Sequence, residues 1–443
     1  MPLYTKVLSE AQYGTVDLMV QVGNFLLPLV SCGIVNGIIR FGLDKYYKKR
    51  DVFTTGFLTI LFGFIILLIL EPILVHVPYL NENTMMIYVF VLMSSMRSLC
   101  SQFVRAKGYV KLYAIDGLLS TATTIFFNVL YLVVLKWGIN GYMLAMISAD
   151  TLSTLFLFYV AGLRRYLHIR GLNLSTSREM LRYSIPMIPN SIFWWVNNMA
   201  SRYMIAYFMG EEYNGLFAVA YKIPTIIVLM SNIFMDAWQM SAVSDSPDKR
   251  ASFFTRVFLF YQSLICTAAS GLILFSKVIT MILVSDSFYE SWKYIPLLLL
   301  STIFSCMSTF LGSVYMVEKK SMLNFITTGI GAVINVVLNF LFIPIFGVNG
   351  AAFATFLSYF VVFVLRVIDT RRFIPMHFHP MRLTFNTLVL LAQAFIMIFE
   401  VKGWIFFELI LTVLMVVANM SALLATVAQL LLKRRPHPQH HEE

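Results

Sequence analysis

The chain has 443 residues, of which 59% are hydrophobic and 12% are charged, and its formal net charge is +11 at pH 7. Soluble globular proteins contain about 25% charged residues, so this composition excludes an ordinary soluble protein and predicts a membrane protein. The positive charge does not require a nucleic-acid partner, because orientation in a bilayer accounts for where the basic residues lie. No nucleic acid is therefore expected among the partners.

Apolar segments of about 20 residues are long enough to cross the hydrocarbon as helices. The sequence predicts thirteen of them, at 15–39, 52–74, 84–104, 112–135, 140–162, 184–209, 215–241, 253–284, 292–317, 322–346, 349–365, 383–399 and 404–432. The predicted fold class is therefore an all-α, polytopic membrane protein.

The polar gaps between these segments alternate in charge. One alternate set of gaps holds 25 of the 33 Lys and Arg residues, and the opposite set holds only Lys6, Lys136, Lys293 and Lys402. Cytoplasmic loops of membrane proteins are enriched in Lys and Arg. The alternation predicts that the basic gaps and the C-terminus face the cytoplasm. With thirteen spans, the N-terminus is then expected outside.

Two loop signatures recur at an offset of about 200 residues. Gly-Ile-Asn-Gly at 138–141 returns as Gly-Val-Asn-Gly at 347–350, and Ser-Glu-Ala-Gln-Tyr-Gly at 9–14 is echoed by Gly-Glu-Glu-Tyr-Asn-Gly at 210–215. Six helices fill such an offset, which predicts two parallel repeats. The alternative is chance, since Gly and Asn favour turns everywhere. The hexapeptide at 210–215 follows a predicted helix, whereas its counterpart at 9–14 follows none. The first half is therefore expected to lack its first helix.

The repeat divides the chain into five parts. Residues 1–162 form a first lobe of five spans without the first helix, 163–183 a cytoplasmic loop, and 184–372 a second lobe of six spans. Residues 373–432 form two extra spans, and 433–443 a cytoplasmic tail. No phosphate-binding loop, dinucleotide fingerprint, zinc motif or catalytic triad context is present. No cofactor, metal site or enzymatic activity is therefore predicted.

Four basic residues lie inside predicted spans: Arg97, Arg202, Lys222 and Lys277. A charge at the bilayer centre costs about 2.5–3.5 kcal/mol, so such residues face a cavity or a partner. Arg202 and Lys222 lie at similar depth on neighbouring helices. Together they suit a diphosphate, to which Arg offers a bidentate fork and Lys a point charge. The alternative is that each pairs with a nearby carboxylate.

Two further cations and the acids in the spans leave alternatives open. Arg97 either faces the same site from the first lobe or extends toward the inner interface. Arg40 either lines the inner mouth or simply begins a basic loop. Asp17 is a candidate for ion coupling, with a structural counter-ion as the alternative. Asp150 is expected to pair with a cation, and Asp116 lies close enough to a helix end to need no special role.

Aromatic and amide residues lie in the middle of the predicted span 184–209. Trp195, Asn197 and Asn198 suit the faces and hydroxyl groups of sugars, and we count them as candidate substrate-binding residues. The alternative is packing between helices, with the Asn side chains as hydrogen-bonding groups.

Five stretches resemble a known family. They are Leu-Ser-Glu-Ala-Gln-Tyr-Gly at 8–14, Phe-Val-Arg-Ala-Lys-Gly-Tyr-Val-Lys at 103–111, Ser-Ile-Pro-Met-Ile-Pro at 184–189, Ser-Arg-Tyr-Met-Ile-Ala-Tyr-Phe-Met-Gly at 201–210 with Ala-Tyr-Lys-Ile-Pro at 220–224, and Asn-Val-Val-Leu-Asn-Phe-Leu-Phe-Ile-Pro at 335–344 running into Gly-Val-Asn-Gly-Ala-Ala at 347–352. The sequence is similar to the polysaccharide biosynthesis flippases, which move lipid-linked oligosaccharides across bacterial inner membranes. Their superfamily also holds the multidrug and toxin extruders.

The resemblance implies two six-helix lobes around a central cavity, often with two extra C-terminal helices. It implies alternating access in the bacterial cytoplasmic membrane and an undecaprenyl-diphosphate type of oligosaccharide substrate. Membrane lipids and a polysaccharide polymerase are the implied partners. One alternative function is a cation-coupled multidrug exporter. A second is a membrane glycosyltransferase or polymerase, but the longest gap, 163–183, is too short for a catalytic domain.

Overall fold

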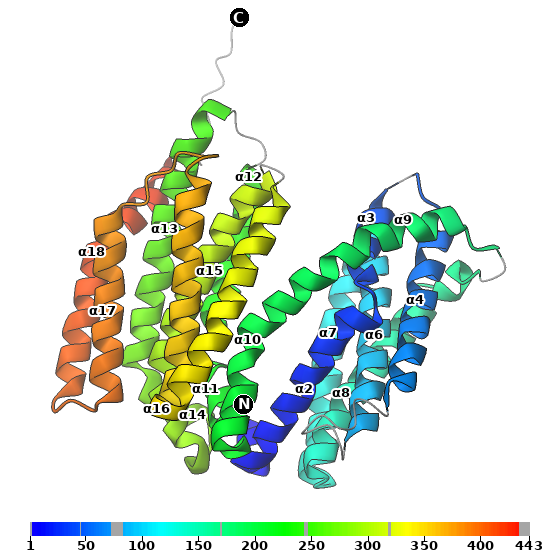
Figure 1. Cartoon of the computed structure of the whole chain (residues 1–443), viewed down its shortest axis with the longest axis horizontal. Coiled ribbons are helices and arrows are strands. Elements are labelled where there is room, and N and C mark those ends of the chain that lie inside the picture. Colours follow the sequence, from blue (N-terminus) through cyan, green and yellow to red (C-terminus); the bar gives the residue numbers. More distant parts are fainter. Residues whose placement is uncertain are drawn as a thin grey trace, which may run out of the picture. The chain divides into compact units, whose positions relative to one another are not determined.

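The structure, a computed structural model, describes residues 2–44, 46–71, 83–168, 171–242, 247–317 and 320–433. All regular secondary structure in this part of the chain is helical, as labelled in Figure 1, and the predicted all-α class is confirmed. The chain forms two compact units, Met1–Gly215 and Leu216–Glu443.

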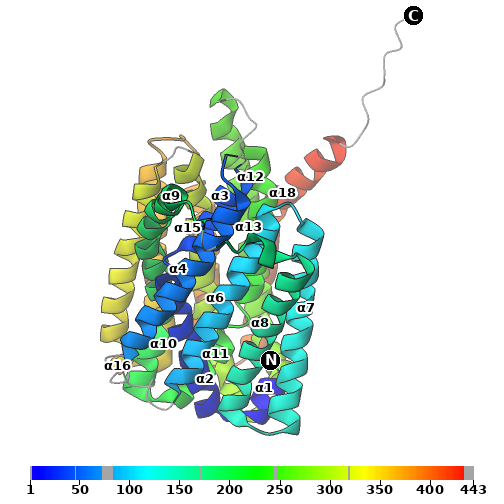
Figure 2. The same ribbon diagram turned by 90° about the vertical axis from the view of Figure 1, so that its right-hand side faces the viewer.

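The first unit contains the helices that form the candidate site described below. They are α1 (Pro2–Val7), α2 (Glu10–Val30), α3 (Ile34–Leu43), α4 (Lys49–Ile69), α6 (Thr84–Ala106), α7 (Val110–Asn128), α8 (Gly138–Val160), α9 (Leu174–Ser184) and α10 (Ile188–Met209). Helix α6 contacts α2, α3, α4, α7 and α8, so it is the central helix of this unit (Figure 2). Its buried residues Leu99 and Phe103 pack with Val52 and Phe53 of α4.

The second unit follows helix α11 (Glu211–Ala220), which begins in the first unit and ends in the second. Its other helices are α12 (Thr225–Ala242), α13 (Pro247–Leu274), α14 (Ser276–Leu283), α15 (Ile295–Val317), α16 (Ser321–Thr370), α17 (Pro380–Ile398) and α18 (Trp404–Lys433). The units divide after Gly215, whereas the sequence-based lobes divide at 163–183. Helix α10 accounts for the difference, because it packs along α2.

In the described part of the chain, ten helices are long and apolar enough to cross a membrane, or eleven if a bent pair counts as one span. Helix α16 holds two of the predicted spans, joined across a break at Gly347 with φ 60° and ψ −142°. Only glycine adopts such a conformation readily.

Two predicted spans are interrupted, which corrects the sequence-based boundaries. The span expected at 15–39 breaks between α2 and α3, where Cys32 and Gly33 have φ of 47° and 63°. The span expected at 215–241 bends by 43° between α11 and α12. Pro224 lies at this bend, and its missing N–H cannot continue a helical hydrogen-bond ladder.

The repeated Gly-x-Asn-Gly loops have the same local structure in both units. Gly138 and Gly347 each have a positive φ, of 56° and 60°. Three residues on, Gly141 and Gly350 lie against a carbonyl of the preceding segment, so that a Cβ would be 3.0 Å from Tyr131 O and 2.3 Å from Phe342 O. Both glycines of each loop are therefore required by the backbone, which favours an internal repeat over chance.

Candidate functional site

The first unit contains a partly open polar cavity of about 410 Å³. Four helices contribute to its wall: α2, α6, α7 and α8. The lining residues are Asn24, Leu27, Phe90, Ser94, Arg97, Ser98, Ser101, Gln102, Tyr113, Thr124, Met146 and Asp150. Pockets for small molecules have volumes of about 300–1,000 Å³. This cavity is large enough for a sugar-sized ligand.

Helix α6 supplies the polar face of the cavity. Ser94, Arg97, Ser98 and Ser101 follow the i, i+3, i+4, i+7 spacing that places residues on one face of a helix. Leu99, which is fully buried, belongs to the apolar core. The apolar segment that predicts this membrane span therefore also carries a stripe of polar residues on one face. This polar stripe is the sequence feature that could have located the cavity.

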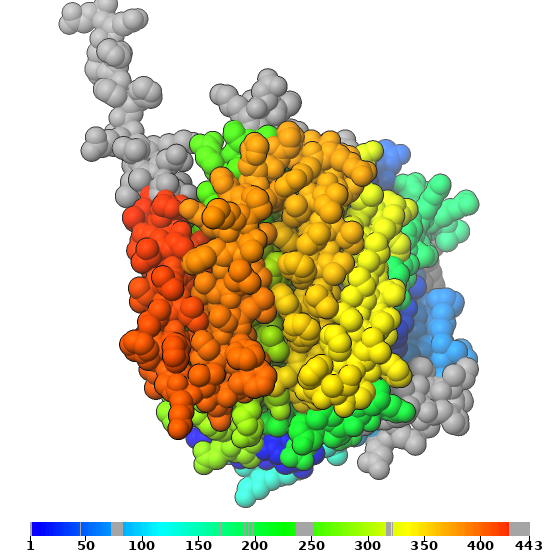
Figure 3. Space-filling view, turned by 60° about the vertical axis from the view of Figure 1, so that its left-hand side comes forward, coloured from blue at the N-terminus to red at the C-terminus, as the bar shows by residue number. Residues whose placement is uncertain are grey.

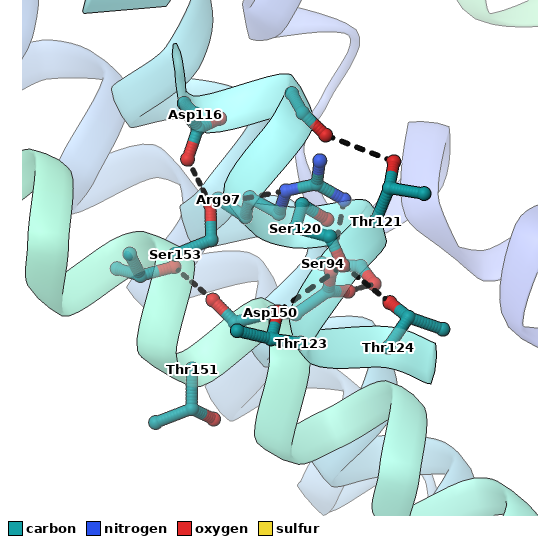
Figure 4. A network of polar contacts seen from close by, with 12 residues as sticks. Ser94, Arg97, Asp116, Ser120, Thr121, Thr123, Thr124, Asp150, Thr151 and Ser153 are labelled. Atoms are coloured by element: carbon teal, nitrogen blue, oxygen red, sulfur yellow. Dashed lines mark hydrogen bonds and ion pairs between the residues drawn. The ribbon is translucent and has the colours of Figure 1, made fainter. Parts of the chain in front are cut away.

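Arg97 is held by side chains of α8 (Figure 4). Its Nη1 donates to Asp150 Oδ1 at 3.0 Å, and its Nε donates to Ser153 Oγ at 3.2 Å. Ser94 donates to the other oxygen of Asp150. Ser153 donates in turn to Asp116 of α7. The network therefore joins α6, α7 and α8 around one guanidinium group.

The network contains two carboxyl groups and one guanidinium. The side chain of Arg97 is 32% exposed and that of Asp150 is 11% exposed, so the cation is the more accessible partner. Asp116 is 1% exposed. This burial corrects the expectation that Asp116 needs no special role because it lies near a helix end. The expected pairing of Asp150 with a cation is confirmed. Guanidinium, hydroxyl and amide groups together can bind sugar hydroxyls or a phosphate.

Arg202 of α10 forms an ion pair with Asp17 of α2. Their side chains are 6% and 10% exposed. Beside them, Tyr203 donates its hydroxyl to the carbonyl of Leu18 at 3.2 Å. Arg202 does not line the cavity described above. Of the two interpretations of Arg202, pairing with a carboxylate is the one that this conformation adopts.

Trp195 bridges α10 and α2. Its Nε1 donates to the carbonyl of Gln21 at 2.9 Å, and its ring packs on Phe25 and Tyr203 at centroid distances of 4.7 and 5.7 Å. These contacts correspond to the packing alternative. The side chains of Asn197 and Asn198 lie outside the described residues.

The remaining predicted site residues lie elsewhere. Arg40 is exposed near the end of α3, with its guanidinium 4.3 Å from the ring centroid of Tyr183. Lys222 lies at the bend between α11 and α12, in the second unit, and is exposed. The cavity thus contains one of the predicted binding residues, Arg97.

Arg366 and Glu408 are among the buried charged residues that the sequence analysis missed. Arg366 was assigned to a cytoplasmic gap, but it lies in α16, is 5% exposed and donates to Ser308 O at 2.7 Å and Thr328 Oγ1 at 3.0 Å. Glu408 lies in α18 and is fully buried. Arg366 ends one apolar run and Glu408 lies within another. A charged residue in such a place is the sequence signal for a buried charge.

Solved structures with similar folds are membrane transporters. An inward-facing multidrug resistance MATE family transporter of the MOP superfamily superposes with a TM-score of 0.69 at 12% identity, covering 84% of this chain and 93% of that one. The lipid II flippase MurJ, in an inward closed conformation, gives a TM-score of 0.63 at 14% identity over 96% of this chain and 95% of that one. The chain therefore has the fold of these two proteins, and its described part holds ten or eleven helices long and apolar enough to cross a membrane.

The family follows from the sequence itself. The model of the family described as "Polysaccharide biosynthesis protein" matches residues 1–238, more than half of the chain. The chain belongs to this family. No curated protein matches the sequence. The resemblance predicted from the five stretches is confirmed.

Proposed function

We propose that this protein is a flippase that moves a lipid-diphosphate-linked oligosaccharide across the bacterial cytoplasmic membrane by alternating access. The substrate class is the repeat unit of an O-antigen, capsule or exopolysaccharide on an undecaprenyl-diphosphate type of carrier. The membership of the family and the polar cavity around Arg97 support this function. The protein acts as a transporter rather than an enzyme, with its C-terminus in the cytoplasm and a polysaccharide polymerase as a partner.

The cavity is the observation that carries the proposal. Its wall offers the hydroxyls of Ser94, Ser98 and Ser101, the amides of Asn24 and Gln102, and the guanidinium of Arg97. Sugars present many hydroxyl groups, each of which donates and accepts, so a wall with both kinds of partner satisfies them. Arg97 supplies charge-assisted hydrogen bonds, which are roughly twice as strong as neutral ones.

We retain Arg202 as a candidate diphosphate ligand, and Lys222, Asn197, Asn198, Trp195 and Arg40 as further candidate substrate-binding residues. Because Asp17 occupies the guanidinium of Arg202, phosphate must compete with this carboxylate. We propose Asp17 as the ion-coupling residue, because its carboxylate pairs with Arg202 in this conformation.

Export of polysaccharide tests the proposal. A strain that lacks its own flippase is complemented with wild type, Arg97→Ala, Arg97→Lys or the control Lys293→Ala, with protein levels measured in each case. Lys293 is a surface cation paired with Glu290, outside the first unit. We expect loss of export in Arg97→Ala, partial export in Arg97→Lys and normal export in the control. Full export by Arg97→Ala contradicts the role of the cavity.

A second candidate function is a cation-coupled multidrug exporter. The network of Arg97, Asp116 and Asp150 carries one formal negative charge when both carboxyls are ionised, and this charge favours a cationic ligand. Drug susceptibility of the same strains distinguishes the two. Resistance to cationic drugs that depends on Asp150, without restored polysaccharide export, supports the exporter.

A further inference from the structure

Two buried polar pairs join the last two helices, α17 and α18. These helices lie side by side (orange to red in Figure 3). Asn386 and Asn419 exchange hydrogen bonds of 3.1 and 3.0 Å, and both are fully buried. Further along, Gln393 Nε2 donates to Glu408 Oε2 at 2.8 Å and to Thr412 Oγ1 at 3.1 Å. The pairs share one seam between the two helices.

The two pairs differ in how well their polar atoms are satisfied. In the asparagine pair each amide both donates to and accepts from the other. In the second pair, Gln393 Oε1 and Glu408 Oε1 are both buried and have no hydrogen-bond partner. An acceptor buried without a partner costs about 1–3 kcal/mol, and more when it is charged. Two such acceptors in one contact indicate that a hydrogen atom belongs there.

Among the described residues, Glu408 forms no ion pair. The helices that pack around this seam are α13, α15 and α17, and the 3-10 segment Asp286–Tyr294, which contacts α17, carries Lys293, a cation paired with Glu290. Among the described side chains of these helices, α15 has no charged residue, α13 has Arg256 and α17 has Arg382. Arg256 lies 14 residues from Ser270, the α13 residue that contacts Thr412. At 1.5 Å per residue that separation is about 21 Å.

Other titratable groups near this seam are accounted for. Arg382 is 11 residues from Gln393, about 16 Å along α17. Lys277 lies against the ring of Trp404, one turn from Glu408, but it is paired with Glu400 at 3.2 Å. Tyr261 and Cys266 of α13 and Cys306 of α15 carry no positive charge.

We propose that Glu408 is a proton-binding site and that its protonated carboxyl forms a closed acid–amide pair with Gln393, which fastens α17 to α18. A proton taken up from the solvent adds to the carboxylate oxygen Oε1 of Glu408, and the side chain loses its negative charge. Oε1 becomes a donor, and Gln393 Oε1 is the acceptor that lacks one. The pair then has two reciprocal hydrogen bonds, as Asn386 and Asn419 have.

Loss of this proton has a mechanical consequence. A carboxylate would face the carbonyl oxygen of Gln393 inside an apolar environment, where an uncompensated charge is costly. The seam would open at this end, while the Asn386–Asn419 pair holds the other. The attachment of α17 to α18 therefore depends on proton occupancy. This site is separate from the cavity of the first unit.

Infrared difference spectroscopy of the full chain in lipid tests the proposal directly. At neutral pH, we expect a carbonyl stretching band of a protonated carboxyl group that Glu408→Gln removes. The matched control is Glu400→Gln, which changes a carboxyl with 56% side-chain exposure and should leave the band unchanged. If Glu408→Gln removes no protonated carboxyl band, the proposal is wrong.

Thermal unfolding of the same variants provides a second readout. Gln carries both a donor and an acceptor, as a protonated carboxyl does, so Glu408→Gln is expected to keep the wild-type unfolding temperature. Glu408→Ala and Gln393→Ala should each lower it, because each leaves a buried polar group without a partner. A Glu408→Gln protein that is as unstable as Glu408→Ala, or that fails to accumulate while Glu400→Gln does, overturns the proposal.

Discussion

Gly14 lies directly against the backbone carbonyl of Glu211. A Cβ added to Gly14 would be 1.9 Å from this oxygen, and a Cβ added to Gly215 would be 2.1 Å from the carbonyl oxygen of Glu10. Residues 10 and 14 are the counterparts of 211 and 215 in the echoed hexapeptides. The contact is therefore reciprocal: each segment offers its glycine to the other's glutamate.

Alanine at this crossing should destabilise the protein. Gly14→Ala and Gly215→Ala each place a methyl group where a carbonyl lies, and forced overpacking costs about 1–3 kcal/mol. Asn214 Nδ2, which donates to Gly14 O at 3.0 Å, would also be displaced. We expect a lower unfolding temperature of the purified protein in detergent.

Gly117→Ala is the matched control for this crossing. Gly117 is also helical, and nothing lies within 4 Å of its added Cβ. Alanine there removes the cost of glycine in a helix, about 0.5–1 kcal/mol, so stability should be equal or higher. Equal behaviour of Gly14→Ala and Gly117→Ala would refute the close crossing.

The sequence predicted the helices better than the contacts between their polar groups. Span positions follow from apolar runs, so α6 and α8 were located within a few residues. The pairing of Arg97 with Asp150 was not, because nothing in the sequence specifies which faces of α6 and α8 meet. Asp116 was dismissed for the same reason: closeness to a helix end along the chain does not report burial.

The breaks in the helices show a second limit. Gly33 interrupts an apolar run that was predicted as one continuous span, whereas the break at Gly347 falls between the predicted spans 322–346 and 349–365. Hydropathy reports burial in lipid, whereas a positive φ depends on which group of another segment packs against that residue. At Gly33 the opposite group is the carbonyl of Ser184, 2.8 Å from an added Cβ. The Gly-x-Asn-Gly signatures at 138–141 and 347–350 did indicate local structure correctly, because the backbone conformation itself requires glycine there.

The ion pair of Asp17 and Arg202 should give strong coupling in a double-mutant cycle. Removing one partner of a buried pair costs about 3–5 kcal/mol, because the other charge is left without compensation. Asp17→Asn and Arg202→Gln should therefore each lower the unfolding temperature. The double variant should be more stable than the sum of the two effects predicts. Strictly additive effects would show that the two side chains do not interact.

Ser153 should matter more than other buried serines of the first unit. Its hydroxyl accepts from Arg97 Nε and donates to Asp116, so Ser153→Ala leaves a buried carboxyl without that donor. We expect a loss of about 1–3 kcal/mol, measured as a lower unfolding temperature. Ser95→Ala is the control, because Ser95 is 1% exposed and its hydroxyl has no partner. Equal losses in the two variants would argue against the network.

Labelling of single cysteines should reveal the orientation of the chain. In a background in which Cys32, Cys100, Cys266 and Cys306 are replaced, Lys402→Cys and Arg178→Cys each place a thiol at an exposed position. Arg178 belongs to the basic set of gaps and Lys402 to the opposite set, so their thiols should lie on opposite sides of the membrane. A membrane-impermeant thiol reagent should label Lys402→Cys in intact cells. Arg178→Cys should react only after the membrane is permeabilised. The reverse pattern would invert the orientation, and labelling of both in intact cells would contradict the alternation itself.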